Sequence, residues 1–175
     1  MPQPHRTAIR RPLYTPEERL RRDRSVWTVV QGILAPLQLI AFLISVWLVV
    51  GFLRTGEGAE MATLSIVIKT GFLYAIMVTG AIWEKEIFGV WLFAPSFFWE
   101  DVVSMGVIAL HTAYLYALLT QSLSIEQQMW LALSAYALYL MNAGQFFYKL
   151  HLARRSRCAT GASEEARDTA WSPGT

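Results

Sequence analysis

The chain has 175 residues, of which 54% are hydrophobic and 16% charged, and its formal net charge is +2. This apolar fraction exceeds that of an ordinary soluble domain, so the composition indicates an integral membrane protein. A soluble helical bundle is disfavoured, because the long apolar segments lack the polar outer faces that such a bundle needs. We expect no nucleic acid partner.

The first 25 residues form a basic segment ahead of the first apolar block. Within it, Thr15 and Glu18 match a capping box and Pro16 stands at the first helical position, which predicts a short helix along the membrane surface. The segment contains seven arginines, and their expected role is to hold it in the cytoplasm. Attraction of an anionic lipid or substrate is the less favoured alternative.

Four apolar blocks follow, and each approaches the roughly 20 residues that an α-helix needs to cross a bilayer. The predicted spans are residues 26–53, 62–83, 102–120 and 129–150. Lysine and arginine gather before the first span and after the last, whereas the two outer connections hold only Arg54. We therefore predict an all-α, integral membrane four-helix bundle in the lipid bilayer, with both termini in the cytoplasm.

Polar side chains recur along single faces of the predicted spans, where they are expensive and therefore mark candidate sites. In the first span Gln31, Gln38 and Ser45 repeat every seven residues, which places them on one inward face. Hydrogen bonding between helices is the open alternative for Gln31, Gln38 and Asn142. Lys69, in the second span, is expected to extend its ammonium group to the outer interface.

Between the second and third spans lies the aromatic stretch "IFGVWLFAPSFF", interrupted by Gly89 and Pro95. It is too short to cross the membrane, so we predict an interfacial or re-entrant loop. Acidic side chains flank this loop on both sides, and we expect them to converge at the cytoplasmic ends of the second and third helices. These candidate catalytic residues are Glu84, Glu86, Glu100 and Asp101.

Contact with aromatic walls removes water from a carboxyl group, and neighbouring carboxylates repel one another. Both effects raise the pKa of one of the four groups, which would make it a general acid near neutral pH. The alternative is that Glu100 and Asp101 cap the positive N-terminal end of the third helix. We favour this alternative for Asp101 and leave the role of the other three carboxylates open.

The third and fourth spans carry one further candidate ligand and one further polar stripe. His111 shares a face with Glu100, roughly 16 Å away along the helix axis. It is either a single axial metal ligand or a hydrogen-bonded bundle residue, and a haem shared with His151 is disfavoured because the two histidines lie at different depths. The polar residues of the fourth span are Tyr139, Asn142 and Gln145.

Residues 151–175 are small, polar and aperiodic, and we predict a disordered tail. Cys158 is the single cysteine, so no internal disulfide forms. The sequence holds no nucleotide-binding glycine pattern, zinc motif or nucleophile elbow. The available chemistry is an acid or base, water at the interface and a flat apolar surface for a substrate.

The most distinctive segments of the chain are "YTPEERLRRDRSVWTVVQGILAPLQ", "MVTGAIWEKEIFGVWLFAPSFFWEDV", "ALHTAYL" and "QQMWLALSAYALYLMNAGQF". Over about residues 14–150 they closely resemble the 3-vinyl bacteriochlorophyllide hydratase family of phototrophic bacteria. The resemblance implies a lyase of the bacterial cytoplasmic (inner or photosynthetic) membrane. Such a lyase adds water across the C3-vinyl group of chlorophyllide a, or of its bacteriochlorin counterpart, to give a 3-(1-hydroxyethyl) group.

The resemblance also implies no separate cofactor, since magnesium arrives within the substrate and water is the co-substrate. Other enzymes of bacteriochlorophyll biosynthesis are candidate partners. A non-catalytic tetrapyrrole carrier or assembly factor is the alternative function. It needs the same aromatic pocket but no acid.

The residues singled out above fit this chemistry. One of Glu84, Glu86 and Glu100 is expected to protonate the outer vinyl carbon, while a neighbouring carboxylate positions the water. His111 is expected to contact the substrate magnesium or its ring, and Lys85 or the N-terminal arginines its propionate. The remaining expected substrate-binding residues are Trp83, Trp91, Phe97, Phe98, Trp99 and Gln145.

Overall fold

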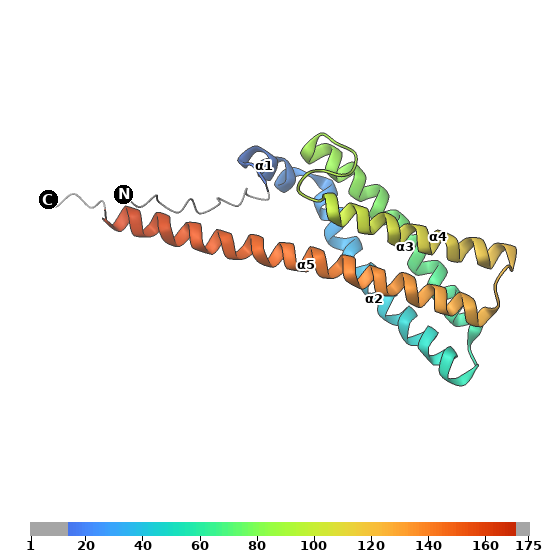
Figure 1. Cartoon of the computed structure of the whole chain (residues 1–175). Coiled ribbons are helices and arrows are strands. Elements are labelled where there is room, and N and C mark those ends of the chain that lie inside the picture. Colours follow the sequence, from blue (N-terminus) through green and yellow to red (C-terminus); the bar gives the residue numbers. More distant parts are fainter. Residues whose placement is uncertain (1–13, 171–175) are drawn as a thin grey trace, which may run out of the picture.

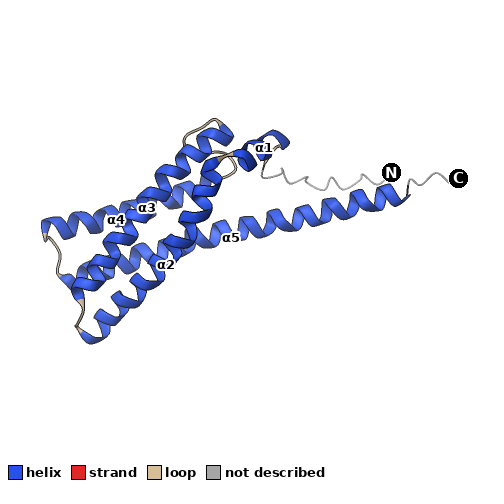
Figure 2. Ribbon diagram, turned by 180° about the vertical axis from the view of Figure 1, so that it is seen from behind, coloured by secondary structure: helices blue, strands red, loops and turns tan. Residues whose placement is uncertain are grey.

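The computed structural model describes residues 14–170, and within this range the chain forms five helices and no strand (Figures 1 and 2). The helices are α1 (Pro16–Arg24), α2 (Val26–Thr55), α3 (Ala59–Phe88), α4 (Phe98–Thr120) and α5 (Ile125–Ala170). The all-α prediction is confirmed for this part of the chain. Predictions for residues 1–13 and 171–175 lie outside the described residues.

The N-terminal helix begins as its capping box predicts. Thr15 Oγ1 accepts a hydrogen bond from the backbone N–H of Glu18 at 3.2 Å, and the Glu18 carboxylate accepts one from the N–H of Thr15 at 2.7 Å. Pro16 occupies the first turn, where no helical partner exists for an N–H group. Ser25 then ends α1 and caps α2, because its hydroxyl accepts from the N–H of Trp27.

Helices α2, α3 and α4 are each long and apolar enough to cross a membrane. They extend beyond the predicted spans, and residues 84–88 and 98–101, expected as flanks, are helical. At 1.5 Å per residue the 30 residues of α3 run about 45 Å, whereas the hydrocarbon core is about 30 Å thick. The ends of α3 therefore reach the polar boundary of a bilayer.

The C-terminal helix differs from its prediction. We expected a disordered tail from residue 151, whereas α5 continues as a helix to Ala170 and runs past the other helices (Figure 1). This segment is rich in alanine, arginine and glutamate, which favour the helix. Polar, aperiodic composition shows that a segment lacks a buried face, and such a segment can still be helical.

The four long helices pack as two antiparallel pairs, α2 with α3 and α4 with α5. The pairs meet where α2 contacts α5 and α3 contacts α4 (Figure 1). A buried cluster joins them at the end of the molecule away from α1. It consists of Phe42, Val49, Ala62, Ile66, Tyr114, Met129, Ala132 and Tyr136. Close packing of such side chains is what holds helices together where lipid is the solvent.

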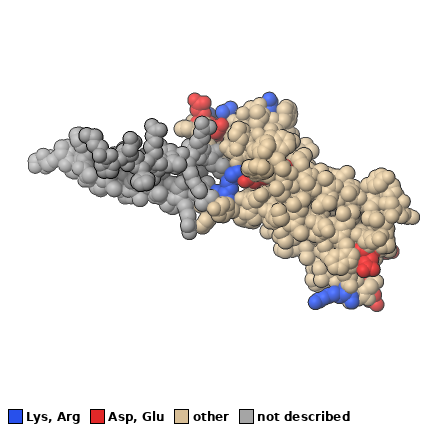
Figure 3. All heavy atoms as spheres, in the orientation of Figure 1, with Lys and Arg blue, Asp and Glu red and all other residues tan. Residues whose placement is uncertain are grey.

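Large apolar side chains, such as Trp47 and Leu119, lie exposed on the outer surface of the described helices. On the face shown in Figure 3, lysine, arginine, aspartate and glutamate gather at two ends and leave a band without charge between them. This pattern fits a molecule whose uncharged middle contacts lipid and whose ends contact water.

Residues 89–97 form the loop that joins α3 to α4. Gly89 ends α3 with φ of 79°, a left-handed conformation that glycine adopts without steric cost. Phe93 also has a positive φ, 61°, which is unusual for a bulky residue. Ala94 and Phe97 are buried and Trp91 is exposed. The loop therefore has an inner side that contacts the helix ends and an outer side that faces the surroundings.

Candidate active site

A cavity of about 580 Å³ lies between α2, α3, α4 and α5. Its volume falls within the roughly 300–1,000 Å³ that small-molecule sites occupy. Most of its wall is apolar. The polar residues that line it are Gln31, Gln38, Glu84, Asp101, Ser104, Tyr139 and Asn142. We call the part bounded by Glu84, Asp101 and Phe97 the carboxyl end, and the part bounded by Gln38, Leu73, Ile108 and Tyr139 the far end.

Two acidic side chains form the carboxyl end. Glu84 comes from the last turns of α3 and Asp101 from the first turn of α4, and only 5% and 6% of their surfaces are exposed. Their carboxyl groups are hydrogen-bonded to each other. Two acids buried side by side repel each other when both are ionised, so we expect one of them to hold a proton. The pair is therefore a buried proton store in contact with the cavity.

The loop supplies the other hydrogen bonds of the carboxyl pair. The backbone N–H of Phe93 donates to Asp101 Oδ2 at 2.8 Å, and that of Ala94 donates to Glu84 Oε2 at 3.2 Å. The left-handed conformation of Phe93 turns successive N–H groups toward the two acids. Such a conformation is costly for phenylalanine and persists where the surrounding contacts compensate it.

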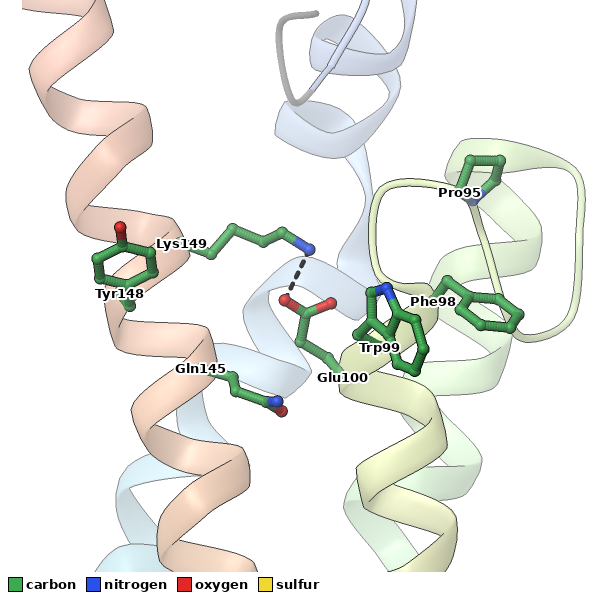
Figure 4. Close-up of a pocket in the computed structure, with 7 residues that line it drawn as sticks. All are labelled: Pro95, Phe98, Trp99, Glu100, Gln145, Tyr148 and Lys149. Atoms are coloured by element: carbon green, nitrogen blue, oxygen red, sulfur yellow. Dashed lines mark ion pairs between the residues drawn. The ribbon is translucent and has the colours of Figure 1, made fainter. Parts of the chain in front are cut away.

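Glu100 belongs to a different arrangement, in a second hollow of about 300 Å³ between α4 and α5. Its Oε1 forms an ion pair of 2.7 Å with Lys149, as Figure 4 shows. Lys149 also donates to the carbonyl of Ser96 and lies 4.8 Å from the centroid of the Phe97 ring. Gln145 lines the same hollow. Phe97 thus separates this ion pair from the cavity that it also lines.

Glu86 and Lys85 lie on the outside of the same helix end. Glu86 is exposed and accepts from the hydroxyl of Ser25 at 2.7 Å. Lys85 is exposed, donates to the carbonyl of Gly89 at 2.8 Å and lies 5.9 Å from the Trp91 ring centroid. The four predicted carboxylates therefore reach the same end of the molecule, but only Glu84 and Asp101 come together.

Glu100 and Asp101 do stand in the first turn of α4, at the positive end of the helix as expected, but neither makes the capping hydrogen bond that was also expected. The residue at the N-cap of α4 is Phe97, and no side chain caps this end. Asp101 accepts instead from the loop N–H of Phe93, and Glu100 pairs with Lys149. The sequence alone could not show this, because both partners come from segments whose position depends on the tertiary fold.

The predicted aromatic residues divide into two groups. Trp83 and Phe97 line the cavity and meet edge to face, with centroids 5.7 Å apart, and Phe97 stacks on Phe146 at 6.0 Å. The other predicted aromatic residues have large exposed fractions. They are Trp91, Phe98 and Trp99. Trp83 and Phe97 are thus the ones placed to contact a molecule inside the cavity.

His111 is fully buried next to Lys69, behind the far end of the cavity. Its Nε2 lies 2.5 Å from the Lys69 Nζ, and its Nδ1 lies 2.7 Å from the carbonyl of Val107. The expectation that Lys69 extends to the outer interface is therefore wrong, because the His111 ring gives it a partner inside the bundle. Contact of His111 with substrate magnesium stays a prediction that these contacts do not support.

The predicted inward stripe of amides includes both interhelical contacts and cavity wall. Gln31 Nε2 donates to Thr79 Oγ1 at 2.7 Å, and Asn142 donates to Ser104 at 2.8 Å. A site role for Lys149 was not predicted from the sequence. The spacing of the polar residues could have indicated this role, because residue 149 lies one further helical turn along the face that carries Asn142 and Gln145.

Comparison with known proteins gives a consistent result. The family described as 2-vinyl bacteriochlorophyllide hydratase matches residues 14–152. A protein of Rhodobacter capsulatus with that name is 59% identical over 175 residues, which cover 100% of this chain and 99% of the relative. One of Cereibacter sphaeroides with the same name is 64% identical over 147 residues, or 84% of this chain and 91% of the relative. No solved structure matches the chain.

Proposed function

This chain belongs to the 2-vinyl bacteriochlorophyllide hydratase family, and we propose that the carboxyl pair of Glu84 and Asp101 is the place where it hydrates its substrate. The chain is a hydro-lyase that acts on a vinyl group of a bacteriochlorophyll precursor. The vinyl group numbered 2 in the family description is the C3-vinyl group of the other tetrapyrrole numbering. Family membership favours the hydratase over the carrier.

One observation carries the assignment of the site. A buried pair of hydrogen-bonded carboxyl groups lies at one end of a largely apolar cavity of ligand size. Hydration of a vinyl group needs a proton donor beside the alkene and a base beside the water. An apolar wall with Trp83 and Phe97 suits a flat macrocycle. An acidic pair and an apolar wall in one cavity support this assignment.

The proposed reaction proceeds in two steps. The protonated member of the pair donates its proton to the outer carbon of the vinyl group, which leaves a cation on the carbon attached to the ring. The conjugated macrocycle stabilises this cation. The oxygen of a water molecule then bonds to it, and the water loses a proton to the carboxylate, which restores the pair. The product carries a 1-hydroxyethyl group, and the net change is the addition of one water molecule.

The groups around the carboxyl pair are proposed to support the reaction in two ways. The loop N–H groups of Phe93 and Ala94 stabilise negative charge on the pair after the proton leaves. Ser104 lies one helical turn from Asp101 and, with Asn142, offers polar atoms for water on the cavity wall. Magnesium enters as part of the substrate, and the proposed steps use only substrate, water and protein protons.

We further assign the molecule to a bacterial cytoplasmic membrane as a four-helix bundle, with α5 as the fourth span and the carboxyl end toward the cytoplasm. Three apolar helices and the uncharged band support a membrane. The arginines of α1 and Lys149 lie at the carboxyl end, and basic residues favour the cytoplasmic side. In this orientation a lipid-soluble substrate enters from the bilayer, while water reaches the carboxyl pair from the interface.

The experiment that tests the site compares Glu84→Gln with Glu86→Gln in membranes that contain each full-length variant. Glu86 is the matched control, because it lies two residues away on the same helix and outside the cavity. Chlorophyllide a is added, and the mass and red absorption band of the pigment are followed. We expect Glu84→Gln to hydrate about 10²–10⁴-fold more slowly than the unmodified protein, and Glu86→Gln to match it.

Two results would contradict the proposal in different ways. Equal activity of Glu84→Gln and the unmodified protein would remove the carboxyl pair as proton donor. Pigment binding by the unmodified protein without a gain of one water would contradict the hydratase function itself. A blue shift of the red band together with the mass of one added water supports both statements.

A further inference from the structure

The far end of the cavity contains a polar side chain that the hydration steps leave unused. Gln38 is 3% exposed and lines the cavity, and its amide has no hydrogen-bond partner among the residues that the structure describes. Its amide atoms are not among the fully buried side-chain atoms that lack a partner, so they are open to the cavity and available to a molecule bound there. Gln31, seven residues earlier on the same face, bonds to α3. The Gln31 amide is therefore occupied by contacts with α3, whereas the Gln38 amide can still bind a ligand.

The packing of α2 against α3 places Gln38 relative to the carboxyl pair. Ser45 contacts Ser65 and Gln31 contacts Thr79, so in this antiparallel pair Gln38 lies opposite position 72. Position 72 is twelve residues before Glu84, or about 18 Å along the axis. Side chains lean toward the N-terminus of their helix, so Gln38 and Glu84 lean toward each other along the cavity. The remaining separation suits a tetrapyrrole with its substituents.

Other contacts make the far end rich in hydrogen-bond donors. Tyr139 lines this end, and its hydroxyl has no hydrogen bond within the described chain. Its ring is held by Phe42, at 4.9 Å between centroids, and by the Lys69 Nζ at 4.7 Å. No carboxylate in the described part of the chain pairs with Lys69. Lys69 already has the His111 ring as its partner and does not line the cavity. The groups left to bind a ligand at this end are therefore the Gln38 amide and the Tyr139 hydroxyl, and each can donate to an acceptor oxygen.

We propose that Gln38 donates a hydrogen bond to a carbonyl oxygen on the edge of the substrate opposite its reacting vinyl group. This inference rests on the proposed function, because it takes the vinyl group to lie at the carboxyl pair. A bacteriochlorophyllide carries a ring ketone on that opposite edge, and its free side-chain carboxylate is the second source of such an oxygen. Gln38 is then a specificity residue that sets which end of the macrocycle meets the acid.

The test measures binding, which needs no turnover. The purified full chain in detergent is titrated with a magnesium-containing vinyl pigment, with an analogue whose ring ketone is reduced to a methylene group, and with the methyl ester of its carboxylate. The variants are Gln38→Met and the control Leu37→Met, which changes the exposed apolar residue next to Gln38 on α2, outside the cavity wall, while conserving its volume. Pigment absorption gives each Kd.

We expect the unmodified protein and Leu37→Met to bind one of the two analogues about 10-fold more weakly than the parent pigment. Gln38→Met should bind that analogue and the parent pigment alike. Dependence on the ketone identifies the ring carbonyl as the acceptor, and dependence on the ester identifies the carboxylate. Either result supports the role of Gln38.

An equal preference in Gln38→Met and in the unmodified protein would overturn the inference, and so would the absence of any preference in the unmodified protein. These binding results are separate from the hydration assay. If the protein does not hydrate the pigment but still prefers it over an analogue through Gln38, the proposed function alone is contradicted. Normal hydration without such a preference would contradict the role of Gln38 alone.

Discussion

Glu100 and Asp101 are neighbours in sequence and are buried to the same extent, 6% exposed each, yet they lie in opposite electrostatic settings. Asp101 faces the cavity and meets another acid, Glu84, whereas Glu100 faces α5 and meets the cation of Lys149. Adjacent residues of a helix point about 100° apart, so they contact different elements. The pair of Glu84 and Asp101 keeps a proton available, whereas the Lys149 cation lets Glu100 stay ionised without one. Burial of an acid therefore does not by itself indicate catalysis.

The largest expected effect comes from breaking the carboxyl pair on both sides. Asp101→Asn should lower kcat/KM about 10²–10⁴-fold, as Glu84→Gln does. The double variant should lose little more than either single one, because both acids serve one proton transfer and such losses are not additive. Steady-state hydration of chlorophyllide a by the three variants measures this. Fully additive losses would show that the two acids act independently.

The second effect is a loss of stability, expected when the ion pair of Glu100 and Lys149 is broken. Lys149→Met leaves the buried Glu100 carboxylate without its partner, and we expect a loss of about 2 kcal/mol in unfolding free energy, reduced from the fully buried case by the partial exposure of Lys149. Thermal unfolding in detergent detects it. Adding Glu100→Gln should restore most of the loss. The folded fraction should keep its kcat, and a large fall in kcat would instead place this ion pair in the chemistry.

A smaller effect is expected in the loop that holds the pair. Phe93→Gly removes the side chain from a left-handed position, which relieves about 1 kcal/mol of backbone strain, while the loss of its contact with Phe98 and added chain entropy offset part of that gain. The N–H bond to Asp101 stays in place. Stability should thus change little and activity should persist. Strong loss of activity would show that the Phe93 ring itself contributes to the site.

The smallest effect is expected at the outer surface of the same helix end. Glu86→Gln preserves an acceptor for the Ser25 hydroxyl, so hydration should stay within about twofold and unfolding within about 0.5 kcal/mol. Activity and thermal unfolding are measured together. A large loss of activity here would extend the catalytic set beyond the pair and weaken the contrast between buried and exposed acids.

Local composition and spacing were enough to predict the apolar helices and the capping box at Thr15, but not the continuation of α5 to Ala170. Family resemblance came from the same source, since it is carried by contiguous segments. Each of the two predicted polar stripes lies partly on the cavity wall, because residues at helical spacing share one face. Gln31 and Gln38 of the first span and Tyr139 and Asn142 of the fourth line the cavity, whereas Ser45 contacts Ser65 and Tyr136 and Gln145 lines the second hollow. The loop between α3 and α4 followed from Gly89 and Pro95 in the same way.

The pairing of the acids and of the buried cations depends on how the helices pack in three dimensions. Sequence spacing predicted that Asp101 caps α4 and that Lys69 reaches the outer interface. Asp101 does stand in the first turn but makes no capping hydrogen bond, and Lys69 is fully buried. Asp101 meets Glu84 across two helices, and Lys69 meets His111 forty-two residues away. Which partner a polar group finds depends on helix rotation and on a loop with one left-handed phenylalanine. A one-turn shift would leave the hydropathy pattern almost unchanged and exchange every partner, so no local pattern can encode the choice.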